Sequence, residues 1–408
     1  MNSISYKQSG SSDRSRYAGI NLLYIVSFAS FFMPANYAVP SSVLSVWEYT
    51  VCLVSIVAIV LYLRSDKIRL RWVLTTIGAC TYYIVSTVLS GSDGSMQSAV
   101  FCTARVVGFT TLLEHGLAHN REATIRNFII GGSIICFIHY ITFLQYRHLP
   151  GGMRNGDLTR IIEGADTVMW FFLKHDNASA FCFLPVLTAY WYRACEYGEG
   201  YRSAIVFSIA TLYMYWWLWS VTAMLTLTVY VLICFYLYHK DDNSVLIRYK
   251  HIVTAGLILC ALVVILSTTD LAETVSSYFG KRAVFGGRKD LWERSLKYIN
   301  GHVGFGAGYE SDLSAVVSIG KNHCHNLILQ LLYTGGLFSF VPIVASYYLY
   351  DSEESTAAIH YSRAQMCLIA SVFAYFLLAA FDWYFHISVQ VFAIILFAYS
   401  GSQCDASE

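Results

Sequence analysis

Long apolar segments dominate this chain and limit its fold more than any other feature. Only 13% of the 408 residues are charged, whereas an ordinary soluble domain carries about 25%. Windows of about 20 mostly apolar residues, long enough to cross a bilayer as a helix, recur along the whole chain. We expect spans at 17–34, 43–63, 72–90, 97–117, 127–145, 177–192, 203–219, 220–238, 251–268, 326–349, 364–381 and 387–400. The sequence therefore predicts an all-α integral membrane protein of about 12 transmembrane helices, with residues 1–408 as a single polytopic domain.

The basic residues in the loops predict the orientation. Fifteen Lys or Arg lie in the N-terminal segment and the loops on one side, including the loop expected at 64–71, whereas the short loops on the other side hold none. Short cytoplasmic loops carry such an excess, so both termini are expected in the cytoplasm. The first apolar segment shows no small-residue cleavage site, which favours a retained span over a signal peptide. The net charge of +1 gives no indication of a nucleic-acid partner.

Two longer segments then fall on the outer side, at 146–176 and 269–325. Long segments escape the bias against external positive charge, and both of these carry several basic residues. The second segment lies between the ninth and tenth expected spans. We predict that it is an outer-face catalytic loop containing short helices.

The stretch "KRAVFGGRKDLWERSLK", residues 281–297, concentrates six cations. Asp290 with Arg294 and Glu293 with Lys297 have the i,i+4 spacing of helical ion pairs. These pairs leave four cations without a local partner: Lys281, Arg282, Arg288 and Lys289.

Arg288 and Lys289 follow Gly286–Gly287 at the start of a predicted helix. The helix is indicated by an apolar stripe at Leu291, Trp292, Leu296 and Ile299. Cations at a helix N-terminus are disfavoured by about 0.3–1 kcal/mol each. They are favourable if an anion such as pyrophosphate binds the free N–H groups there. A basic helix lying against lipid headgroups is the alternative.

The turn "GFGAG", residues 304–308, should let the backbone approach a ligand or another span. The stretch "KNHCHN" then opens the tenth span and allows three interpretations of His323 and His325. They can be metal ligands with Cys324, part of a cap on the span that begins at Asn326, or a general base and its neighbour. Three adjacent residues cannot all point one way, and a catalytic zinc needs further ligands. We therefore predict no metal.

Charged residues inside or beside the spans are further candidates. Arg105 and Glu114 lie in or near the fourth span, where buried charges are usually paired and functional. They are about 13 Å apart along one helix, so each needs a partner on another helix. Asp382 and His386 are expected on the outer side, where they can help to build a cleft.

The topology, "GRKDLW", "GFGAG" and an "HN" that opens an apolar helix with "GG" resemble the O-antigen ligase and O-antigen polymerase family of bacteria. The resemblance is most specific over about 280–340. It implies a cofactor-free, metal-independent, inverting glycosyltransferase of the inner membrane. The substrate implied is a glycan linked to a polyprenyl (undecaprenyl) pyrophosphate, used at the periplasmic face.

The resemblance also assigns roles. Arg288 matches the loop arginine that holds pyrophosphate, and His325 matches the histidine that deprotonates the acceptor hydroxyl. The family's Ser-Arg pair is missing, because "WSVTAM" at 219–224 has no arginine. Other residues are candidates for further pyrophosphate contacts or for supporting roles: Lys289, Arg282, Lys281, Lys174, His175, His323, Asn326, Arg105 and Asp382.

Polymerase and ligase differ in the acceptor, which is another lipid-linked repeat unit or the sugar core on lipid A. We favour the polymerase, because the missing Ser-Arg pair fits a divergent member. Membrane lipid, a flippase and a chain-length regulator of the same pathway are the expected partners. A transporter of anionic or lipid-linked substrates would require internal repeats or paired broken helices, and a metal-dependent hydrolase would require more ligands.

Overall fold

The computed structural model describes residues 18–34, 39–65, 67–146, 172–173, 176–218, 220–240, 248–267, 288–349, 361–382 and 388–400. Those residues form helices and connecting turns, with no β-strand among them. The all-α prediction is therefore confirmed for this part of the chain.

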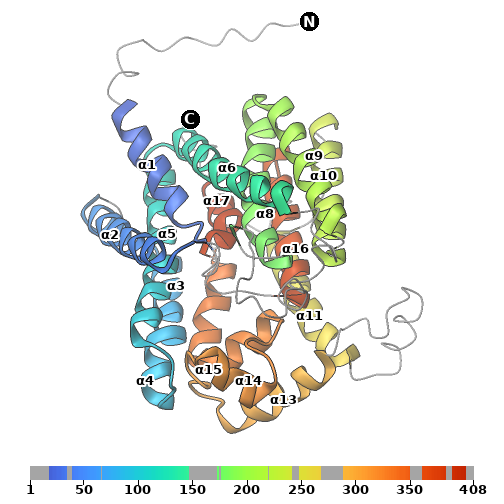
Figure 1. The fold of residues 1–408 in the computed structure, drawn as a ribbon. Helices are drawn as coiled ribbons and strands as arrows, with labels where there is room; N and C mark the ends of the chain where they lie inside the picture. Colours follow the sequence, from blue (N-terminus) through green and yellow to red (C-terminus); the bar gives the residue numbers. More distant parts are fainter. Residues whose placement is uncertain are drawn as a thin grey trace, which may run out of the picture.

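The helices occupy the apolar segments that the sequence predicts (Figure 1). Their bounds are α1 (Ala18–Ser30), α2 (Ser41–Ser65), α3 (Leu70–Cys80), the π-helical turn η1 (Thr81–Val85), α4 (Ser86–Ser90), α5 (Met96–His119), α6 (Arg121–Tyr146), α8 (Asp176–Tyr197), α9 (Tyr201–Leu218), α10 (Val221–His239), α11 (Tyr249–Ser267), α13 (Arg288–Gly301), α14 (Asp312–Ile319), α15 (Leu327–Tyr348), α16 (Arg363–Phe381), the 3₁₀ turn η2 (Ser388–Val391) and α17 (Phe392–Ser400). α9 ends at Leu218 and α10 begins at Val221, so two helices replace the continuous apolar run, as expected.

In the described part of the chain, 8 helices are long and apolar enough to cross a membrane. They are Ser41–Arg64, Leu70–Ser90, Met96–His119, Arg121–Gln145, Val221–His239, Tyr249–Ser267, Leu327–Tyr348 and Arg363–Phe381. The protein is thus a multi-pass membrane protein, but the number of twelve spans is not confirmed. The span predicted at 387–400 is one that is not confirmed. The apolar helix there, Val389–Ser400, is short for a hydrocarbon core of about 30 Å.

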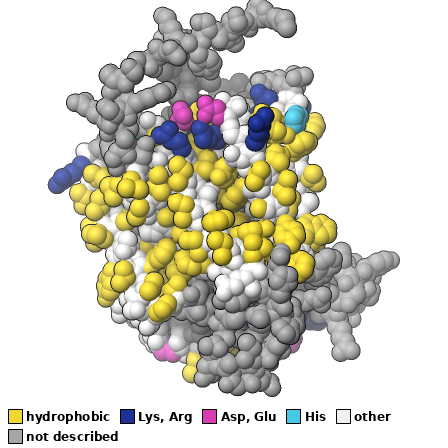
Figure 2. Space-filling model, turned by 45° about the horizontal axis from the view of Figure 1, so that its top comes forward, with side chains coloured by type: hydrophobic (Ala, Val, Ile, Leu, Met, Phe, Trp, Pro, Cys, Tyr) yellow, Lys and Arg dark blue, Asp and Glu magenta, His cyan; other side chains and the backbone are white. Residues whose placement is uncertain are grey.

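The two ends of the bundle differ. In Figure 1, α13 and α14 lie together at the end away from the start of α1. Figure 2 shows acidic and basic side chains gathered at the other end, above a face covered by hydrophobic side chains. This surface is what lipid would cover.

Glycines allow close approach at several helix crossings. A Cβ at Gly108 of α5 would collide with Ser55 of α2, and one at Gly256 of α11 would collide with the ring of Phe376 of α16. In lipid, small residues of this kind let helices pack by van der Waals contact.

Glu114 is fully buried and joins three helices, as the sequence requires of a charge in a span. Its carboxylate pairs with Arg71 of α3 and accepts a 2.5 Å hydrogen bond from the hydroxyl of Tyr399 of α17. Arg69 lies over the Tyr399 ring at 4.1 Å. The assignment of Arg71 to a loop at 64–71 is wrong, because this residue lies buried in the first turn of α3.

α15 is not one continuous helix. Gly336 has φ 61° and ψ −166°, so a nine-residue half-helix from Leu327 to Gly335 precedes the break. The predicted turn 304–308 fills the break, and Gly306 and Gly308 both have positive φ. Four backbone hydrogen bonds join turn and break: Ala307 N–H to Tyr333 O (2.6 Å), Gly308 N–H to Thr334 O (2.9 Å), Leu337 N–H to Val303 O (2.9 Å) and Phe338 N–H to Gly304 O (3.2 Å). The expectation that this turn approaches another span is confirmed.

A second set of contacts holds the segment between α13 and α15 against the connection between α4 and α5. Asp93 accepts hydrogen bonds from the hydroxyls of Ser311 (2.7 Å) and Ser314 (2.6 Å) at the start of α14. These bonds lower the pKa of Asp93 to about 2. The π-helical turn η1 lies nearby, and its Tyr83 ring packs on Tyr309 at 5.6 Å.

Candidate functional site

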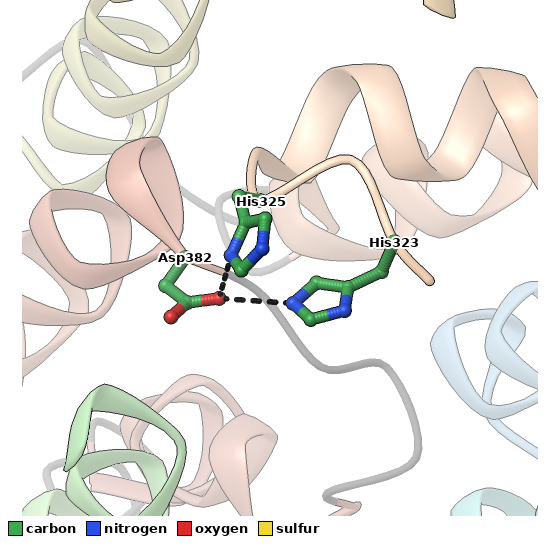
Figure 3. Close-up of side chains that lie close together, drawn as sticks. All are labelled: His323, His325 and Asp382. Carbon is green, nitrogen blue, oxygen red and sulfur yellow. Dashed lines mark hydrogen bonds and ion pairs between the residues drawn. The ribbon is translucent and has the colours of Figure 1, made fainter. Parts of the chain in front are cut away.

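The two histidines of "KNHCHN" converge on one carboxylate (Figure 3). Oδ1 of Asp382 lies 2.9 Å from Nδ1 of His325 and 3.4 Å from Nε2 of His323. The two imidazole ring centroids are 3.8 Å apart. Asp382 follows directly after α16, so the cluster joins the end of one span to the start of another.

The backbone that carries the two histidines is a series of bends rather than an extended strand. Cys324 between them is buried, whereas both histidine side chains are partly exposed beside Asp382. His325 adopts φ 51°, the one positive φ among the described non-glycine residues. Strained backbone of this kind persists where the surroundings over-determine it.

Asn326 fixes the position of His325 relative to α16. Its Oδ1 accepts hydrogen bonds from the N–H groups of Ile328 (3.1 Å) and Leu329 (3.2 Å), which caps α15 as one of the sequence interpretations proposed. Its Nδ2 donates to the carbonyl groups of Cys260 in α11 and Ala380 in α16. This fully buried amide therefore joins α11, α15 and α16 directly behind the histidine.

Three further side chains hold Cys324. The indole Nε1 of Trp292 donates to its carbonyl oxygen at 2.8 Å, and Ser295 contacts its sulfur at 3.4 Å. Its N–H donates to Oε1 of Gln330 at 2.6 Å. Sequence reasoning missed this role of Gln330, although a lone glutamine inside an apolar run was a usable signal.

Arg288 lies on the same face of α13 as those contacts. Residues spaced by four and three lie on one side of a helix, so Arg288, Trp292 and Ser295 form one stripe. Arg288 is the first residue of the helix, as predicted, and it is half-buried. It therefore lies one turn, about 6 Å along the axis, before the contact of Trp292 with Cys324.

The electrostatics of the cluster favour an ionised Asp382. Burial alone would raise the pKa of this carboxyl, but the charge and hydrogen bonds of His325 and His323 outweigh it and hold the pKa well below its usual range. In the neutral form of His325, a hydrogen bond from Nδ1–H to this carboxylate leaves the lone pair on Nε2. The side chain of His325 is 20% exposed.

The same three residues can also hold a metal ion. His323, His325 and Asp382 each offer one ligand atom, and these atoms lie within 4.8 Å of one another. The third ligand, Asp382, follows a different span, so the spacing of the two histidines does not indicate it. Cys324 is not part of the set, and its buried sulfur contacts Ser295 of α13 instead. The absence of a metal stays a prediction.

Five sequence candidates lie outside the described residues: Lys174, His175, Lys281, Arg282 and His386. Lys289 is exposed beside Arg288.

Arg105 is buried on α5, where its electrostatic neighbours include Glu48 and Cys52 of α2 and Tyr83 of η1.

Two details of α13 differ from expectation. Leu296 is 46% exposed, so the apolar stripe is carried by Leu291 and Trp292, with Ser295 in place of Leu296. Neither expected i,i+4 ion pair on α13 forms in the described structure. Those cations are therefore solvated.

Comparison with known proteins finds one family model that matches part of the chain. Residues 202–344 match the family model described as O-antigen ligase. The predicted resemblance to O-antigen ligases and polymerases is thereby confirmed, over a range that holds Arg288, His323, His325 and Asn326 but not Asp382. The match supports a membrane protein that processes glycans and uses lipid-linked glycan substrates. No curated protein and no solved structure matches the chain.

Proposed function

We propose that this protein is a metal-independent, inverting glycosyltransferase that polymerises oligosaccharide repeat units carried on a polyprenyl pyrophosphate. The reaction takes place at the outer face of the bacterial inner membrane, with both chain termini in the cytoplasm. The hydrogen bond from His325 to Asp382 carries the proposal, since it sets an imidazole base at the mouth of a span.

In this reaction the acceptor hydroxyl gives its proton to Nε2 of His325. The hydroxyl oxygen then forms a bond to the anomeric carbon of the donor sugar. The bond from that carbon to the pyrophosphate oxygen breaks, and the lipid pyrophosphate leaves with the electron pair. Asp382 orients His325 and stabilises the imidazolium ion.

Arg288 has the role of binding the leaving group. A guanidinium at a helix N-terminus adds to the free N–H groups there, and both favour a pyrophosphate. Lys289, and Lys281, Arg282 and Lys174 outside the described residues, are the proposed sources of further positive charge.

The test is a complementation assay in a deletion strain. His325→Ala and Arg288→Ala are expected to abolish long-chain surface polysaccharide while the protein remains in the membrane. The matched controls are His251→Ala and Lys297→Ala, which replace exposed residues of the same charge type. Normal chain length in the first two variants would refute the site. Normal chains that are not attached to the lipid core in the deletion strain would identify a ligase instead.

A metal-dependent transferase or hydrolase is the second candidate, because the three potential ligands converge. Activity of the purified protein after exhaustive chelation separates the two. Loss of activity that is restored by one divalent metal, with that metal bound in equimolar amount, would establish the second candidate.

A further inference from the structure

A second polar cluster lies beside the loop that carries the histidines. The rings of Tyr298 and His302 stack with centroids 4.3 Å apart, and Tyr298 lies 5.1 Å from the ring of Tyr333. The Tyr333 hydroxyl donates a 2.5 Å hydrogen bond to Oε2 of Glu310. These four residues are called the Glu310 cluster below. His302 is exposed and Glu310 is half-buried, so the cluster reaches the surface.

α13 connects this cluster to the proposed catalytic site. Trp292 and Ser295 contact Cys324 at the middle of the helix. Arg288 lies about 6 Å before Trp292 along the axis, and Tyr298 lies about 9 Å beyond it. Along α13, the segment 321–326 that carries the two histidines therefore lies between Arg288 and the Glu310 cluster.

The geometry of an inverting displacement suggests which substrate binds on each side of His325. The attacking oxygen and the leaving group lie on opposite sides of the anomeric carbon. If the pyrophosphate binds near Arg288, the acceptor must approach from the other side of His325. The Glu310 cluster lies on that side.

The chemistry of the cluster suits a sugar. A carboxylate accepts strong hydrogen bonds from hydroxyl groups, and the described residues occupy Oε2 of Glu310 while leaving Oε1 for a ligand. Aromatic rings offer a large rigid surface with a negative face, on which the C–H groups of a sugar can pack. Nδ1 of His302 is engaged by its own helix at Tyr298 O, 3.1 Å away, which leaves Nε2 as a further polar contact.

We propose that the Glu310 cluster binds the sugars of the acceptor glycan and thereby selects the repeat unit that is extended. This inference rests on the proposed function. Glu310 contacts a sugar hydroxyl, Tyr298 and His302 pack on the sugar ring, and Tyr333 holds the Glu310 carboxylate in position.

The test uses the full-length protein in liposomes with the lipid-linked repeat unit extracted from a strain that lacks this gene. Glu310→Gln and Tyr298→Ala are expected to raise KM for this substrate about tenfold or more, because each removes a sugar contact. kcat should stay close to that of the parent. Inhibition by farnesyl pyrophosphate, which has no sugar, should be unchanged in both variants and weakened by Arg288→Ala.

Two controls separate binding from structure. Glu293→Gln replaces an exposed glutamate of α13 and should leave KM unchanged. Tyr333→Phe removes the internal hydrogen bond but keeps the Glu310 carboxylate, so its rise in KM should be smaller than that of Glu310→Gln. An unchanged KM in Glu310→Gln, or equal effects of Glu310→Gln and Tyr333→Phe, would overturn the inference. Full activity of His325→Ala and Arg288→Ala in the same assay would instead overturn the proposed function.

Discussion

The break in α15 gives the sharpest prediction, which concerns Gly336→Ala. The backbone at Gly336, with φ 61° and ψ −166°, belongs to a region that is essentially restricted to glycine. A Cβ there would also collide with the carbonyl oxygen of Gly304. The backbone strain costs about 1–3 kcal/mol. Displacing the turn would remove the bonds of Leu337 and Phe338, at about 0.5–1.5 kcal/mol each. The expected destabilisation is roughly 2–6 kcal/mol.

Two other glycines separate these contributions. Gly198 has φ 68° with nothing within 4 Å of its Cβ position, so Gly198→Ala tests the backbone cost alone. Gly301 has neither a positive φ nor a close neighbour, so Gly301→Ala tests neither cost.

The assay is thermal unfolding of purified protein in one detergent at a fixed scan rate, together with polysaccharide synthesis in cells. Gly336→Ala should unfold at the lowest temperature, Gly198→Ala should be intermediate, and Gly301→Ala should resemble the parent. An unfolding temperature of Gly336→Ala equal to that of Gly301→Ala would refute the docking of the turn into the break.

Three further predictions follow from the site and its supports. Asp382→Asn should lower kcat by about 10²–10⁴-fold with little change in unfolding temperature, since His325 loses the charge that stabilises its protonated form; parent-like kinetics would exclude an orienting role. Asn326→Ala should destabilise the protein by roughly 1.5–5 kcal/mol in thermal unfolding, because it removes a helix cap and two hydrogen bonds to buried carbonyl groups; a parent-like unfolding temperature would contradict this. Asp93 has a pKa lowered to about 2 on folding from an ordinary value of 3.8, so its stabilising tie to Ser311 is complete above about pH 4 and is lost as the pH falls towards 2. The protection of the backbone amides at the start of α14 against hydrogen exchange, relative to an unfolded chain, should decrease over that pH range in the parent. In Asp93→Asn this protection should be low at every pH.

Much of the fold could be predicted from the sequence because the apolar segments are long and their ends are marked by polar residues. The start of α13 at Arg288 and the cap of α15 at Asn326 follow from local chemistry, which acts over a few residues. The contact between His325 and Asp382 is different, because it joins positions 57 residues apart on two spans. No periodicity or spacing reports such a pairing.

Two sequence predictions were wrong, one about the buried face of α13 and one about the position of Arg71. The buried face of α13 was predicted from its apolar residues alone. Ser295 also faces inward, where its hydroxyl donates a hydrogen bond to the sulfur of Cys324. The partner of Glu114 was missed because Arg71 was counted with a loop, although it lies one residue inside α3. Helix ends are the least certain part of a sequence prediction, and here a charge pair depends on one of them.

The link from Asn326 to Ala380 has a consequence for the lipid environment. His325 and Asp382 belong to spans of unequal length, with 22 residues in α15 and 19 in α16. A bilayer that is thicker or thinner than the protein prefers changes the tilt of spans, and unequal spans respond unequally. The buried amide of Asn326 resists that relative movement at the level of the histidine. We therefore expect the position of His325, the proposed base, to depend little on membrane thickness, because one buried side chain links its span to α16.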